Sequence, residues 1–138
     1  MSLGLFTTPP PRNEPVLGYA PGSRERKALE AELARQAGEV IEIPLVLGGK
    51  EVRTGRTADV VMPHDKQHVL AKVHLGGANE VARAIECATA ARAAWQRFSW
   101  EERAAIFLRA GELLAGPWRD RINAATMLGQ SKTAHQAE

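Results

Sequence analysis

From residue 76 onward, the sequence is a succession of amphipathic helical patterns, and this run constrains the fold more than any other feature. The first helix is predicted to begin at Asn79 as its N-cap. The second begins at Ser99-Trp-Glu-Glu102, which matches the S-x-x-E capping box, and ends before Gly116-Pro117. A third follows, and Ser131 is predicted to cap a fourth. The apolar stripes of the first three are Val81, Ala84, Ile85, Ala88, Ala91 and Trp95; Ile106, Ala110, Leu113 and Leu114; and Ile122, Ala125, Met127 and Leu128.

Between residues 39 and 75 the pattern changes to that of β-strands. Pro44 interrupts the first apolar run and favours an edge position or a break, because proline lacks a backbone donor. Gly48-Gly49 predicts a hairpin turn. We expect the strands to form an antiparallel β-meander, in which alternation places His74 on the wetter face. The predicted strands are 40–47, 50–54, 58–62 and 68–75.

The first part of the chain combines an arm and a helix. Residues 1–22 are rich in proline and glycine, which predicts an extended N-terminal arm without regular structure. Ser23 is the expected N-cap of a helix over 24–37, and Gly38 is the expected stop.

The predicted fold class is therefore α/β: an extended arm, a helix, an antiparallel β-meander and then amphipathic helices. Four short strands offer little apolar surface to three such helices. Either the helices cover one another, or the chain is the beginning of something larger. Because the fourth helix has only just begun at Glu138, we expect the second arrangement.

Composition and charge exclude several function classes. Eighteen Lys and Arg against 16 Asp and Glu give a net charge of +2 without a dominant basic stripe, so nucleic acid is not an expected partner. No apolar run approaches the roughly 18 residues of a membrane span. The first residues lack the basic and apolar regions of a signal peptide and the Arg-rich character of a transit peptide. We therefore expect a cytoplasmic protein.

The chemically reactive side chains form no complete catalytic constellation. Cys87, the single cysteine, falls in the middle of a predicted helix, beside Glu86 and next to the apolar stripe, so packing is favoured over a nucleophilic role. Gly129-Gln-Ser-Lys-Thr133 lacks the glycines of a P-loop, and Gly76-Gly77 lacks the spacing of a dinucleotide fingerprint. No metal site is expected, because the histidines lack ligand spacing and are predicted to lie in turns and on strand surfaces. They are His64, His68, His74 and His135.

Several blocks nevertheless resemble the aldehyde dehydrogenases in order and spacing. They are the hairpin Leu45–Thr54, the strand Val69-Leu-Ala-Lys-Val73, the helix end Ala90-Ala-Arg-Ala-Ala-Trp95, and the capped helix Glu102-Arg-Ala-Ala-Ile-Phe-Leu108. Further segments are similar to one subfamily, the L-glutamate γ-semialdehyde (Δ1-pyrroline-5-carboxylate) dehydrogenases. These are Asn13-Glu-Pro-Val-Leu-Gly-Tyr19 with Gly22-Ser-Arg-Glu-Arg26, and Thr126-Met-Leu-Gly-Gln-Ser-Lys-Thr133 with Gln136-Ala-Glu138, where Ser131 replaces an expected glycine.

This resemblance implies an NAD-dependent oxidation of L-glutamate γ-semialdehyde, which forms from pyrroline-5-carboxylate, to L-glutamate in proline catabolism. It places the nucleophilic cysteine, the general-base glutamate and the nucleotide-binding elements beyond residue 138, so this chain alone is expected to be inactive and not to bind NAD. Residues 23–138 are expected to form an incomplete N-terminal portion of the NAD-binding domain. That portion docks onto the remainder of the fold through Ile85, Trp95, Ile106 and Leu113. An aldehyde substrate and a homo-oligomer are implied for the full-length enzyme.

Glu138 is the one position that the resemblance places near the substrate, beside its ammonium group or aliphatic part. The alternative is an exposed carboxylate in the first turns of a helix. Two further hypotheses concern the whole chain. It is a standalone, non-enzymatic interaction module that binds a partner through its helical stripes or its basic Arg24–Arg35 face, or it is the truncated, inactive product of a gene.

Overall fold

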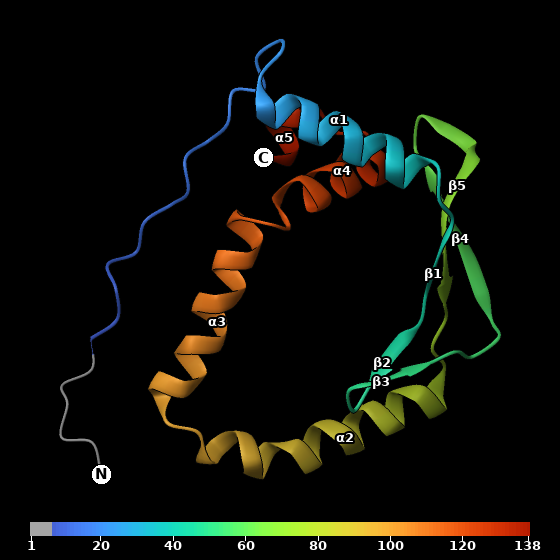
Figure 1. The fold of residues 1–138 in the computed structure, drawn as a ribbon. Coiled ribbons are helices and arrows are strands. Elements are labelled where there is room, and N and C mark those ends of the chain that lie inside the picture. The colour runs from blue at the N-terminus through green and yellow to red at the C-terminus, as the bar shows by residue number, and fades with distance from the viewer. Residues whose placement is uncertain (1–6) are drawn as a thin grey trace.

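The computed structural model describes residues 7–138, so the first part of the predicted arm, residues 1–6, lies outside the described residues. Figure 1 shows the elements around an open frame. The first helix and the last two lie along the top, the strands lie along the right, and the remaining helices complete the bottom and the left. The helices are α1 (Arg24–Ala37), α2 (Ala78–Arg97), α3 (Trp100–Ala115), α4 (Arg119–Gln130) and α5 (Ala134–Ala137). The strands are β1 (Ile41–Ile43), β2 (Leu45–Leu47), β3 (Lys50–Val52), β4 (Thr57–Met62) and β5 (Asp65–His74).

Helix α1 has the predicted bounds, because both of its ends carry strong local signals. The Ser23 side chain accepts a hydrogen bond from the backbone N–H of Arg26. Gly38 closes the other end, and its N–H donates to the carbonyls of Ala34 and Arg35. The chain from residue 7 to 20 has no helix or strand, as predicted for an extended arm.

The strands differ from the predicted antiparallel meander. Strands β2 and β3 do form the antiparallel hairpin, and β4 and β5 pair antiparallel. However, β1 pairs with β5 in parallel, with Ile41 opposite Ala71, so the main sheet is mixed and has the order β1-β5-β4. Pro44 separates β1 from β2, and that break lets the two halves of one apolar run join different sheets.

Two of the predicted helix caps are wrong, and each differs by a few residues. Helix α2 is capped by Gly77 rather than Asn79, since the Glu80 carboxylate accepts from the Gly77 N–H at 2.7 Å. Ser131 ends α4 in the left-handed region, with φ 53°, and Thr133 caps α5 instead. The Ser99–Glu102 capping box that opens α3 is present as predicted.

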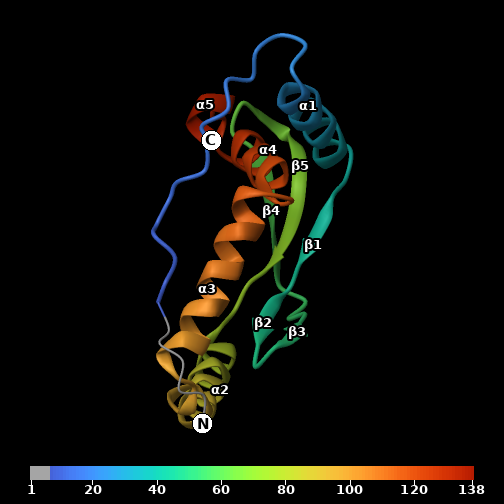
Figure 2. The same ribbon diagram turned by 60° about the vertical axis from the view of Figure 1, so that its left-hand side comes forward.

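The core of the described chain is small and lies between the arm, α1 and α4. Tyr19, Leu29 and Ala124 are its buried members, and Figure 2 shows the arm passing close to α5 beside it. Burying a leucine such as Leu29 contributes about 2 kcal/mol. Leu17, Leu33, Met127 and Ala134 are partly buried and pack around these residues. This core fastens the arm to the helices near the end of the chain.

Helices α2 and α3 are largely uncovered. Within residues 7–138, neither helix buries a residue. Of the predicted docking stripes, Ile85 is 62% exposed and Ile106 51%, whereas Trp95, at 38%, is partly covered within the described chain. No helix of residues 7–138 is both long and apolar enough to cross a membrane. The predicted division into an arm and a partial domain stays a prediction.

Candidate functional site

The carboxylate of Glu138 lies at the centre of a polar cluster that joins the two ends of the described chain. Glu138 follows α5, while Arg119 and Asn123 come from α4. The four-residue spacing places both α4 side chains on one face of that helix. Tyr19 reaches the cluster from the arm. We call these four residues the Glu138 cluster.

Both oxygens of the Glu138 carboxylate accept hydrogen bonds. Oε1 accepts from the backbone N–H of Leu17 at 3.0 Å and from Arg119 Nη2. Oε2 accepts from the Tyr19 hydroxyl at 2.6 Å, from Asn123 Nδ2 at 2.8 Å and from Arg119 Nε at 3.2 Å. The Arg119 guanidinium therefore binds both carboxylate oxygens in a bidentate ion pair, which is the strongest arrangement of arginine and carboxylate.

The Glu138 cluster is protected from solvent. The Glu138 side chain is 2% exposed, that of Arg119 15%, and Tyr19 and Asn123 are also buried. Paired charges that are buried together depend on their hydrogen bonds, and loss of one partner leaves the other uncompensated. The alternative of an exposed carboxylate is therefore wrong for Glu138. The predicted contact of Glu138 with a substrate stays a prediction. Because both carboxylate oxygens already accept hydrogen bonds, a substrate ammonium group would share an oxygen with one of these donors.

Tyr19 is held in a backbone conformation that non-glycine residues rarely adopt. Its φ is +48°, in the left-handed region. This conformation costs a side-chain-bearing residue roughly 1–2 kcal/mol. The cost is offset because the turn directs the phenol into the core. There its hydroxyl donates to Glu138 and accepts from Asn123 Nδ2 at 3.0 Å.

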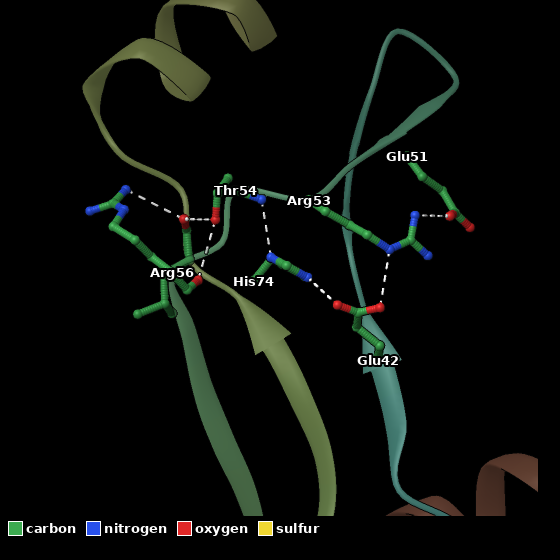
Figure 3. A network of polar contacts seen from close by, with 7 residues as sticks. Glu42, Glu51, Arg53, Thr54, Arg56 and His74 are labelled. Atoms are coloured by element: carbon green, nitrogen blue, oxygen red, sulfur yellow. Dashed lines mark hydrogen bonds and ion pairs between the residues drawn. The ribbon is translucent and has the colours of Figure 1, made fainter.

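A second polar cluster, shown in Figure 3, surrounds the predicted surface histidine of β5. His74 has the predicted register, but its ring is only 4% exposed, because Glu42 of β1 and the segment after β3 cover it. His74 Nδ1 accepts from the Thr54 N–H at 3.0 Å, so Nε2 carries the proton that is donated to Glu42 Oε1 at 2.7 Å. This bond, followed by that from Arg53, lowers the pKa of Glu42. The cluster ties β1 and the segment after β3 to β5, and the prediction of a surface histidine is wrong here.

The remaining histidines and the cysteine have separate surroundings. His64 lies in the turn between β4 and β5, where Nδ1 is 2.7 Å from the Ser131 hydroxyl. His68 Nε2 donates to the Ala37 carbonyl, and His135 meets the Tyr19 ring edge-on. Within residues 7–138, no group of three or more His, Cys, Asp or Glu side chains could hold a metal ion.

Cys87 lies in the middle of α2, against the turn of the β2–β3 hairpin. A Cβ atom built on Gly48 would be 3.0 Å from the Cys87 Sγ. This close approach agrees with the packing role predicted for the cysteine.

A cavity of about 490 Å³ lies between α1, the main sheet and α4. Its apolar lining includes Ile41, Leu70 and Trp118, and its charged lining comprises Arg35, Glu39 and Arg121. Among the described residues, its lining includes no histidine, cysteine or serine.

The N-terminus of α2, which follows Gly76-Gly77, is a poor place for the phosphates of NAD. A helix N-terminus after paired glycines is the most plausible place for a dinucleotide phosphate. At α2, however, the Gly77 N–H already donates to Glu80, and this bond is the largest cause of the lowered pKa of that carboxyl. A phosphate there would meet the Glu80 charge.

Comparison with known proteins gives consistent matches. Residues 51–138 match the model of the aldehyde dehydrogenase family. The Δ1-pyrroline-5-carboxylate dehydrogenase of Agaricus bisporus is 44% identical over 137 residues, and the match covers 99% of this chain and 25% of that protein. The mitochondrial enzyme of that name from Homo sapiens is 43% identical over 126 residues, covering 91% of this chain and 22% of its own length.

Solved structures match the whole arrangement. The crystal structure of the Δ-pyrroline-5-carboxylate dehydrogenase from Mycobacterium tuberculosis bound with NAD superimposes with a TM-score of 0.95 at 46% identity. That match covers 99% of this chain and 26% of the other. The chain thus spans about a quarter of the length of the proteins it matches.

Proposed function

The chain belongs to the aldehyde dehydrogenase family, and we propose that it is the N-terminal part of an NAD-dependent dehydrogenase that oxidises L-glutamate γ-semialdehyde, formed from pyrroline-5-carboxylate, to L-glutamate. One observation carries this proposal. Over 99% of its residues, the chain shares both 46% sequence identity and the backbone arrangement of a Δ-pyrroline-5-carboxylate dehydrogenase that binds NAD.

In this proposal the described residues build scaffold and the remainder of the protein performs the chemistry. NAD supplies the oxidant when it is bound, and its site lies on the remainder. Cys87 packs against a hairpin turn and does not act as the nucleophile. The 138-residue chain by itself forms no NADH.

The remainder of the dehydrogenase is the proposed partner of α2 and α3. The exposed apolar side chains on these helices include Ile85, Trp95 and Ile106. An uncovered apolar face of this extent is typical of a surface that another part of a fold covers. The complete protein is a homo-oligomer in this proposal.

Glu138 is the proposed point at which the described residues approach the substrate. Its carboxylate is held rigidly by Arg119, and a negative charge beside the substrate ammonium would favour binding. In the longer protein, Glu138→Gln should raise KM for the aldehyde. If Glu138→Ala keeps the wild-type kcat/KM, Glu138 does not contact the substrate.

Two measurements on the protein from its native source test the proposal. The first is its intact mass, which should be several times the 15.0 kDa of this chain. The second is NADH absorbance with pyrroline-5-carboxylate, with acetaldehyde as the control substrate. NADH formation that is specific for pyrroline-5-carboxylate supports the proposal. A longer protein that reduces no NAD would refute it.

The exposed face of α2 and α3 also fits the interaction module considered above. A native mass of 15 kDa would favour that function, or a decayed gene, over the dehydrogenase.

A further inference from the structure

The N-terminal arm is attached to the rest of the described chain at very few points. Between residues 7 and 20, every side chain is exposed except those of Leu17 and Tyr19. The arm also offers the Pro15 carbonyl, which accepts from Arg119 Nη2 at 2.6 Å. Each of these three residues forms a hydrogen bond with Glu138 or Arg119.

We propose that Tyr19 is a positioning residue, which orients the Glu138 carboxylate and fastens the arm to α4 and α5. The consequence for activity rests on the function proposed above, in which Glu138 lies beside the substrate. The fastening itself rests only on the contacts of the described residues.

The geometry distinguishes the phenol hydroxyl from the ring. The ring fills the core with Leu29 and Ala124, and a phenylalanine would fill it equally well. The hydroxyl does what a phenylalanine cannot: it donates to Glu138 Oε2 and accepts from Asn123 Nδ2. Because Asn123 also donates directly to the same oxygen, Tyr19, Asn123 and Glu138 form a closed triangle of hydrogen bonds. Together with the two hydrogen bonds from Arg119, this triangle orients the carboxylate so that Oε1 faces Leu17.

The first test measures how firmly the arm is held in the longer protein. The readout is the hydrogen-exchange rate of the Leu17 amide, because this N–H donates to Glu138 Oε1. In Tyr19→Phe the ring remains and the hydroxyl is lost, so Leu17 exchange should accelerate about tenfold. Exchange in the middle of α3 should stay unchanged. Glu14→Gln, which neutralises an exposed carboxylate on the same arm, is the matched control and should leave Leu17 exchange unchanged. Wild-type exchange at Leu17 in Tyr19→Phe overturns the proposal.

The second test uses steady-state kinetics of the longer protein. Tyr19→Phe should raise KM for the aldehyde by about three- to tenfold, while KM for NAD and kcat remain near their wild-type values. An equal fall in kcat for every substrate indicates general damage and overturns the positioning role, as does an unchanged KM for the aldehyde. If the wild-type protein reduces no NAD, the proposed function fails, and the Leu17 exchange still decides whether Tyr19 fastens the arm.

Discussion

Substituting Gly48 by alanine should selectively weaken the β2–β3 hairpin. Gly48 has φ +57°, a conformation that alanine adopts only at a cost, and its added Cβ would lie 3.0 Å from the Cys87 Sγ. Gly49, the neighbouring turn residue, has φ +76° and no atom within 4 Å of a built Cβ. The two glycines therefore share the backbone constraint, and only Gly48 has the close contact.

The expected loss of stability follows from the backbone conformation, which both glycines share, and from the close contact, which only Gly48 has. The left-handed conformation costs an alanine about 1–2 kcal/mol. The reduced freedom of the unfolded chain offsets about 0.4–1 kcal/mol of this. Overpacking against the sulfur adds about 1 kcal/mol, the lower end of the usual range, because one side chain has to move. We expect Gly48→Ala to destabilise the hairpin by about 2 kcal/mol and Gly49→Ala by about 1 kcal/mol.

Hydrogen exchange of a peptide spanning residues 45–52 measures this local opening, because β2 and β3 pair within it. Cys87→Ala removes the sulfur, so Gly48→Ala should cost about 1 kcal/mol less in the Cys87→Ala background than in the wild type. Equal effects of Gly48→Ala and Gly49→Ala, or no coupling between Gly48→Ala and Cys87→Ala, would refute the argument from the close contact.

Three further expectations concern the helices. Hydrogen bonds from Arg35 and then Gln36 lower the pKa of Glu32 to about 2. Because the folded pKa lies below the usual 4.5, the stabilisation is complete above about pH 4.5 and disappears as the pH falls through 2. At this surface site the lowered pKa of Glu32 contributes about 1 kcal/mol to stability. The contribution is measurable as a loss of α1 helicity in acid, and this loss should be absent in Glu32→Gln. Ser99→Ala should cost α3 about 1 kcal/mol and speed exchange of the Glu102 amide; unchanged exchange would contradict the capping role. The chain alone should bind a hydrophobic dye and self-associate through α2 and α3, so a cooperative thermal transition in a monomeric sample would contradict that expectation.

Features that depend on neighbouring residues were predictable. The bounds of α1, the capping box at Ser99 and the hairpin at Gly48-Gly49 agree with the structure. Each depends on hydrogen bonds or on backbone angles within a few positions. The mistaken caps at Asn79 and Ser131 are also local, because the residues that cap these helices, Gly77 and Thr133, each lie only two positions away.

The candidate site was only partly predictable. The resemblance singled out Glu138 and a block that ends at Tyr19, but no sequence pattern indicated that Tyr19, Asn123 and Arg119 contact Glu138. Leu17 and Glu138 are 121 positions apart, and their hydrogen bond forms only after α1, α4 and the arm have packed. A buried His74 was equally invisible, because the alternation of β5 defines its face and not what covers that face.

Local sequence patterns were enough to predict the types and approximate ends of most elements, the α/β class and the resemblance to aldehyde dehydrogenases. Three features became visible only once the chain was folded: the parallel pairing of β1 with β5, the left-handed conformation of Tyr19, and the carboxylate that holds the arm. The physical reason is the range of the interactions. Capping and turn preferences act over a few residues, whereas strand pairing and buried polar contacts depend on the packing of segments that are distant in the chain.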